Sequence, residues 1–211
     1  MKKKILSLLI ACIMMTPITS VFAGTWVNKG IDYKNGTRWQ YMNDDGSYIK
    51  NGWQLIDGDW YYFSHEGMQY NETIYYKLSN GMPDETKPIY YVGSDGKMVK
   101  GGWYKESDTY SVFTDTEGKM PTGFFFINDD LYYVPIESYS SKCIDTTWQG
   151  ESSETFIGVD GKFHTLKCYK IGGKILDVDK QPLRADDKLW TLYPYIPKYN
   201  SQGILVGEIK N

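Results

Sequence analysis

The chain has 211 residues and a formal net charge of −3 at pH 7. After residue 23 it contains no cluster of lysine and arginine of the kind that phosphate contacts require, which argues against nucleic-acid binding. Nineteen tyrosines and seven tryptophans are many for this length, and aromatic side chains supply large buried area to thin elements with little interior.

Residues 1–23 have the pattern of a secretory signal peptide. Three lysines at positions 2–4 precede an apolar run over 5–15, and Val21-Phe22-Ala23 suits a signal peptidase. A lipobox-like sequence ending at Cys12 is the alternative, with lipidation of that cysteine. No later apolar stretch approaches the roughly 20 residues of a membrane span, and no Leu-Pro-x-Thr-Gly signal follows. We therefore expect a protein that is secreted or attached non-covalently to the cell surface.

After the signal, an aromatic residue followed five positions later by glycine recurs along the chain. The glycines of these copies are Gly46, Gly67, Gly96, Gly118 and Gly161, with separations of 21, 29, 22 and 43 residues. Each copy predicts a β-hairpin whose turn needs glycine, because the turn requires positive φ. A fixed period in this range indicates stacked repeats. The predicted fold is all-β, a solenoid of β-hairpin repeats of about 21 residues that degenerates towards the C-terminus.

The repeats divide the mature chain into two parts. Residues 24–138 are predicted to form the hairpin array, with the best copy at 52–71 and a short additional hairpin at 74–81. Residues 139–211 are less regular, and either degenerate capping repeats or a small separate β-domain fits them.

Cys143 and Cys168 are the only cysteines after the signal. An even pair in an exported protein predicts a disulfide, with two free thiols as the alternative.

Motifs for catalysis or metal binding are missing from the sequence. His65 lies in a hairpin turn. His164 could act as a base for Cys143 or Cys168, but the sequence around neither cysteine resembles a thiol hydrolase. The segment 177–182 begins like a calcium loop but lacks the central glycine and the closing glutamate, and there is no glycine-rich phosphate loop. We therefore expect no enzyme activity, no metal and no cofactor; an enzyme hidden after Ser138 is the alternative.

The second half of each repeat is also regular. Gly52-Trp53 leads to Trp60-Tyr61-Tyr62-Phe63, and Gly96-Lys97-Met98 leads to Gly102-Trp103. From about Trp39 to Tyr133 this pattern resembles the cell-wall/choline-binding repeat family of Gram-positive surface proteins. Related repeats bind glucan in secreted glucosyltransferases and carbohydrate in clostridial toxin tails.

The resemblance implies ligand sites between consecutive repeats. Such a site combines the Gly-Trp tryptophan, the first aromatic residue of the next strand, an aromatic residue of the following repeat and often a methionine. Carried over by position, this nominates Trp53, Trp60 and Met68 with Tyr90 or Tyr91, and Trp103 and Tyr110 with Tyr132.

The chemistry of these residues leaves two ligand classes open. Aromatic faces attract quaternary ammonium groups and also stack on sugar rings. The expected partner is therefore choline-bearing teichoic acid or a glycan of the cell envelope. The alternative function is a structural or adhesion protein, whose repeats form a scaffold for a host or surface protein.

Overall fold

The computed structural model describes residues 24–34, 36–77, 84, 86–135, 143–184, 188–193 and 195–210. The predicted signal peptide, Cys12 included, lies outside the described residues, as does the end of the additional hairpin predicted at 74–81. None of the helical structure described is long and apolar enough to cross a lipid bilayer.

The described residues form strands and one short 3-10 helix, so the predicted all-β class is confirmed. In chain order the elements are β1 (Gly24–Ile31), β2 (Thr37–Asn43), β3 (Gly52–Ile56), β4 (Asp59–Phe63), β5 (Glu72–Ile74), β6 (Ile89–Val92), β7 (Gly102–Lys105), β8 (Tyr110–Thr114), β9 (Lys119–Met120), β10 (Gly123–Ile127), β11 (Asp130–Val134), β12 (Ile144–Asp145), β13 (Gln149–Ile157), β14 (Phe163–Ile171), β15 (Lys174–Leu176), η1 (Lys188–Leu192), β16 (Tyr195–Tyr199) and β17 (Leu205–Lys210).

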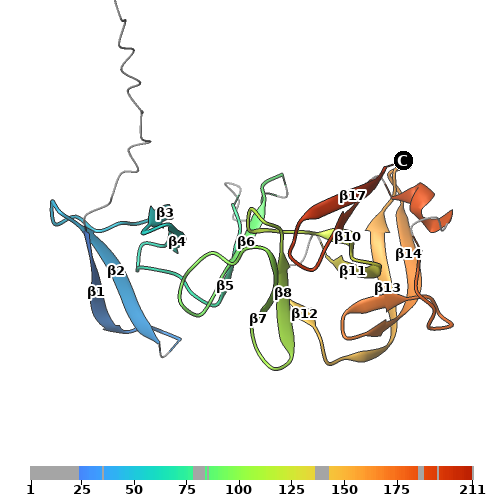
Figure 1. Ribbon diagram of the computed structural model, residues 1–211, viewed down its shortest axis with the longest axis horizontal. Coiled ribbons are helices and arrows are strands. Elements are labelled where there is room, and N and C mark those ends of the chain that lie inside the picture. The colour runs from blue at the N-terminus through green and yellow to red at the C-terminus, as the bar shows by residue number, and fades with distance from the viewer. Residues whose placement is uncertain are drawn as a thin grey trace, which may run out of the picture.

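Hairpins follow one another along the long axis of the molecule, from β1–β2 at one end to β13–β14 at the other (Figure 1). β3–β4, β7–β8 and β10–β11 are antiparallel pairs of consecutive strands. All five turn glycines singled out by the repeat have positive φ, from 73° at Gly161 to 145° at Gly67. This order of hairpins is compatible with a stacked repeat array.

Each turn of the first units folds back onto the hairpin before it. The backbone N–H of Met68, after the turn that follows β4, donates to the carbonyl of Trp39 on β2 at 2.8 Å. The N–H of Met98 donates in the same way to the carbonyl of Trp60 on β4, also at 2.8 Å. Backbone bonds therefore fix the position of one unit on the next, independently of side-chain packing.

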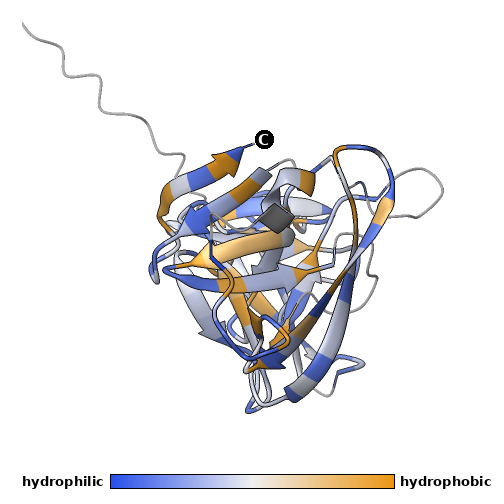
Figure 2. Ribbon diagram, turned by 90° about the vertical axis from the view of Figure 1, so that its right-hand side faces the viewer, coloured by the Kyte–Doolittle hydropathy of each residue, from blue (hydrophilic) through white to orange (hydrophobic). Residues whose placement is uncertain are grey.

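The second half of the chain departs from the 21-residue period. A seven-stranded sheet runs in the order β13-β14-β15-β11-β10-β16-β17, and β13 and β14 have nine residues each. Figure 2 views this end and shows hydrophobic residues on the strands at its centre. Its core includes Phe124, Leu131, Ile175, Trp190 and Ile196, each at most 2% exposed. The sheet joins strands from both sides of residue 138.

The C-terminal hairpin also returns to the repeat array. Tyr199, at the end of β16, packs against Phe113 of β8 with 5.7 Å between ring centroids. In the following turn the carbonyl of Gly203 accepts a hydrogen bond from Thr116 at 3.2 Å. The end of the chain thus covers a hairpin that lies far before it in the sequence.

The predicted disulfide between Cys143 and Cys168 is absent from the structure. Cys168, 2% exposed, lies inside the core of the seven-stranded sheet, and its Sγ faces the carbonyl of Ser152 at 3.6 Å. Cys143 packs instead against a separate cluster built on Tyr91, Val112 and Met120. The two cysteine side chains serve two different cores, which their spacing in the sequence does not reveal.

Burial predicts how Cys168 reacts. Burial and the nearby Glu154 carboxylate raise the pKa of the Cys168 thiol, and the thiolate is the reactive form. We expect Cys168 to remain unmodified by iodoacetamide in the folded chain and to be alkylated after denaturation without reductant, as measured by peptide mass spectrometry. A Cys168 that stays unmodified in denaturant until reductant is added would contradict the account, because it would be in a disulfide.

The independence of the two parts of the chain stays a prediction. In a repeat array the units contact mainly their neighbours, so a fragment that ends at Gly123 should keep its hairpins. The cores around Phe63 and around Tyr91 are largely contained in residues 24–123. We expect this fragment to show strand content by circular dichroism and cooperative thermal unfolding. A fragment without strand signal would mean that the seven-stranded sheet is required for the whole fold.

Candidate functional site

An aromatic contact recurs between consecutive units. In each case a tryptophan on the first strand of a hairpin meets one ring on the paired strand and one ring of a later unit. The ring centroids are separated by 5.1 and 5.0 Å for Trp26 with Tyr41 and Tyr61, by 5.2 and 5.3 Å for Trp53 with Tyr62 and Tyr90, and by 5.3 and 5.3 Å for Trp103 with Phe113 and Tyr132.

The first of these contacts borders an open groove of about 320 Å³. Three aromatic side chains, a thioether and a carboxylate line it, namely Trp26, Trp39, Tyr61, Met68 and Asp95. We call it the aromatic groove. Its residues come from three successive units, because β1 and β2 supply the tryptophans, β4 supplies the tyrosine, and the turns after β4 and β6 supply the last two.

Local backbone structure places each residue of the aromatic groove. The hydrogen bond from the Met68 N–H to the Trp39 carbonyl sets the thioether beside the second tryptophan. Tyr61 is held from the following unit by a β-bridge to Lys97. Gly96 has φ of 78°, and a Cβ there would lie 2.4 Å from the Met68 Sδ. Position 96 thus requires glycine for two reasons: the turn needs positive φ, and the Met68 thioether occupies the space that a Cβ would fill.

The charged side chain in the lining of the aromatic groove is a carboxylate. Asp95 is exposed, and its Oδ1 accepts a hydrogen bond from the backbone N–H of Lys97 at 3.0 Å, which orients the carboxylate. The Lys97 ammonium pairs with Asp59 at 2.6 Å. Burial raises the pKa of the Tyr61 phenol, so this ring is neutral at physiological pH. The groove is therefore lined by uncharged aromatic side chains and one carboxylate.

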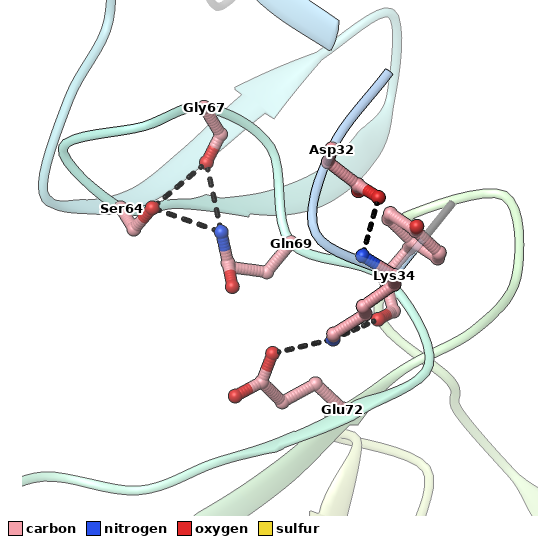
Figure 3. A network of polar contacts seen from close by, with 7 residues as sticks. Asp32, Lys34, Ser64, Gly67, Gln69 and Glu72 are labelled. Carbon is pink, nitrogen blue, oxygen red and sulfur yellow. Dashed lines mark hydrogen bonds and ion pairs between the residues drawn. The ribbon is translucent and has the colours of Figure 1, made fainter. Parts of the chain in front are cut away.

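A polar network joins the first unit to the next (Figure 3). Lys34, in the β1–β2 loop, donates to Glu72 at 2.8 Å and to the Tyr70 carbonyl at 3.0 Å. Gln69 donates to Ser64 at 2.9 Å and to the Gly67 carbonyl at 3.1 Å. These bonds hold the turn that carries Met68, and they hold β1–β2 against it.

The same arrangement repeats one unit later. Met98 bonds to Trp60 as Met68 bonds to Trp39. Tyr90 pairs with Lys119 as Tyr61 bridges to Lys97. A Cβ on Gly118 would lie 3.0 Å from the Met98 Sδ. The residues equivalent to those of the aromatic groove are Trp53, Trp60, Tyr90, Met98 and Glu117.

The structure brings part of the first nominated residue set together. Trp53 and Tyr90 are in ring contact at 5.3 Å. Trp60 lies on β4 between them in sequence and accepts the hydrogen bond from Met98. Met68 lies in the aromatic groove, one unit earlier. Tyr91 is 2% exposed inside a hydrophobic cluster.

The second nominated set is divided in a similar way. Trp103 and Tyr132 are in ring contact at 5.3 Å, with Tyr132 buried and Trp103 40% exposed. Tyr110 lies at the start of β8, opposite Asp145 of β12, while Trp103 pairs with Phe113 near the other end of that strand. β8 corresponds to β2 and β4, which carry Trp39 and Trp60 two residues before a tyrosine. At that position, two residues before Phe113, β8 has Ser111 in place of a tryptophan.

Sequence reasoning missed four residues of the aromatic groove: Trp26, Trp39, Tyr61 and Asp95. The first unit lacks the Gly-Trp dipeptide, since Thr25 precedes Trp26, and its β1–β2 loop is longer than the loops of β3–β4 and β7–β8. One signal was available. Trp39 stands two residues before Tyr41, as Trp60 stands two residues before Tyr62, so aligning the strands would have nominated it.

No protein-family model matches the chain. Glucosyltransferase-S of Streptococcus mutans is 31% identical to it over 131 residues, and the alignment covers 53% of this chain and 8% of that protein. The chain thus matches less than a tenth of the length of this relative.

Similar solved structures include choline-binding repeat proteins. The modular Cpl-1 endolysin of phage Cp-1, complexed with a peptidoglycan analogue, has a TM-score of 0.40 and 23% identity, over 89% of this chain and 42% of that one. Choline binding protein F from Streptococcus pneumoniae has a TM-score of 0.39 and 18% identity, over 77% of this chain and 48% of that one.

The two requirements on Gly96 can be separated by substitution. Gly96→Ala and Gly46→Ala both force alanine to positive φ, which costs roughly 1 to 2 kcal/mol. A Cβ at Gly46 would meet no atom within 4 Å, whereas at Gly96 it displaces Met68. We expect urea unfolding to show a larger loss of stability for Gly96→Ala than for Gly46→Ala. Equal losses would mean that Met68 moves away without cost and that its position is not fixed.

Proposed function

We propose that this chain is a secreted, non-catalytic binding protein that holds a quaternary ammonium group, such as the choline of an envelope polymer, in the aromatic groove. The observation that carries the proposal is that three aromatic side chains, a thioether and a carboxylate line a groove of about 320 Å³. The resemblance of the repeats to cell-wall/choline-binding repeats supports it independently. Residues 1–23 direct export, and the bound ligand attaches the protein to the cell surface.

The chemistry of the lining favours a cation over a sugar. Each ring face contributes roughly 0.5 to 2 kcal/mol to the binding of a cation, depending on how far the cation is desolvated. The methyl groups of a trimethylammonium are apolar and pack on the rings and the Met68 thioether, while its charge is compensated by Asp95. The lining contains no lysine or arginine that would repel it. A sugar would need several donors and acceptors around its hydroxyls, and the groove supplies few.

Two equivalent positions on one chain would act together. The residues around Trp53 repeat the geometry of the aromatic groove in the next unit. A polymer that carries many choline groups can occupy both positions at once, so the second binding step becomes intramolecular. Weak individual sites then suffice to retain the protein on a choline-bearing surface.

Trp39→Phe tests the proposal directly. Phenylalanine keeps an aromatic wall but attracts a cation less than tryptophan does, so we expect the affinity for choline to fall by about 0.5 to 1 kcal/mol with little change in thermal stability. Calorimetric titration of residues 24–211 with choline measures this. Trp148→Phe, at a half-exposed tryptophan far from the groove, is the matched control and should bind as the unchanged chain does.

Asp95→Asn separates the charge from the geometry. The amide oxygen can still accept the hydrogen bond from Lys97, so the turn is preserved while the carboxylate charge is lost. We expect weaker choline binding in this variant too. Binding that is unchanged in both Trp39→Phe and Asp95→Asn, or that an α-1,6-linked glucose tetramer abolishes by competition, would contradict a cation site in the aromatic groove.

A further inference from the structure

A second cavity, of about 330 Å³, lies in the other half of the chain between the β13–β14 hairpin and the segment around β12. Its volume falls within the roughly 300 to 1,000 Å³ typical of small-molecule sites. The walls include Val134 and Ile144, and the polar lining includes Asp145, Ser152 and Lys170, with Trp148 among them. None of these residues belongs to the aromatic groove or its repeat.

Trp148 is a half-exposed ring in a fixed position. It is 43% exposed. Its backbone N–H donates to the Asp145 Oδ1 at 3.0 Å, and its carbonyl accepts from Gly172 at 3.0 Å. A Cβ added at Gly150 would come within 2.9 Å of the indole ring, so the ring lies directly over glycine backbone. The indole that lines the cavity is thus held against the chain, so a ligand orders it at little conformational cost.

The lysine that lines the cavity, Lys170, belongs to a compensated ion pair. Lys170 contacts Glu154 at 2.6 Å, and the Glu154 side chain is only 9% exposed. The Ser152 hydroxyl donates to the same carboxylate at 2.9 Å. The hydrogen bond from the Thr147 N–H, together with its hydroxyl, lowers the pKa of Asp145, which therefore stays ionised. Donors and acceptors thus line the cavity together, without an uncompensated positive charge.

We propose that this cavity binds one unit of a neutral oligosaccharide, whose ring stacks on Trp148 while its hydroxyls bond to Asp145, Ser152 and Lys170. A pyranose has an apolar face that suits a single indole, and each hydroxyl both donates and accepts. A quaternary ammonium group would meet the two aromatic residues Trp148 and Tyr133 here, instead of the three in the aromatic groove. An anion would meet the Asp145 carboxylate, and Lys170 is already paired. The inference goes beyond the proposed choline site and does not depend on it.

Fluorine NMR of the chain labelled with 5-fluorotryptophan can test the two sites separately. The resonance of Trp148 is assigned as the one missing from Trp148→Phe. The probes are a tetramer of β-1,4-linked N-acetylglucosamine and a tetramer of α-1,6-linked glucose, which distinguish a wall glycan from a glucan. We expect at least one tetramer to shift the Trp148 resonance at millimolar concentration or below, and choline to leave it unchanged.

Calorimetry on variants completes the test. Trp148→Ala should weaken binding of the active tetramer at least tenfold, and Ser152→Ala several-fold. Phe163→Ala, at an exposed ring on the far end of the same hairpin, and Trp39→Phe should bind it unchanged. The proposal is overturned if neither tetramer shifts Trp148, or if the folded Trp148→Ala chain binds as tightly as the original. A loss in Trp39→Phe instead would place the sugar in the aromatic groove and would count against both sites.

Discussion

The backbone hydrogen bond from each turn to the preceding hairpin is the constraint on which the site depends. Met68 to Trp39 and Met98 to Trp60 are the two examples. Such a bond fixes the offset between units, and the tryptophan at the start of each hairpin then meets a tyrosine one unit later. Because the offset is set by the main chain, the side chains between units need not fill the whole space. Where they leave it open, as at Met68, a groove remains.

The same repeated contact has different surroundings at two positions. At Trp26 and Trp39 the groove faces solvent. At Trp103 the strand lacks a second tryptophan, and the ring of Phe113 packs against Tyr199 from the C-terminal hairpin. The chain therefore uses one repeated contact in two ways. It lines an open groove near the N-terminal end and serves as packing where the array meets the seven-stranded sheet.

Much of the first half could be predicted from the sequence, because its information is local. The spacing from aromatic residue to glycine predicts the hairpins and the positive φ of the turns, and Trp53 with Tyr90 and Trp103 with Tyr132 are in contact as nominated. The sequence pattern grouped Met68 with Trp53 and Trp60, but its side chain lies one unit earlier, beside Trp26 and Trp39. The spacing of the repeats does not show onto which hairpin a turn folds back. The long pairing of β13 with β14 and the separate surroundings of Cys143 and Cys168 depend on contacts between distant segments, which no local pattern contains.

The central claim is that the aromatic groove binds a quaternary ammonium group, and a crystal structure of residues 24–211 grown with choline tests it most directly. The account predicts the trimethylammonium nitrogen within about 6 Å of the ring centroids of Trp26, Trp39 and Tyr61, with the Met68 thioether in contact and Asp95 on the open side. Choline bound only elsewhere, or a groove that remains without ligand at saturating choline, would contradict it.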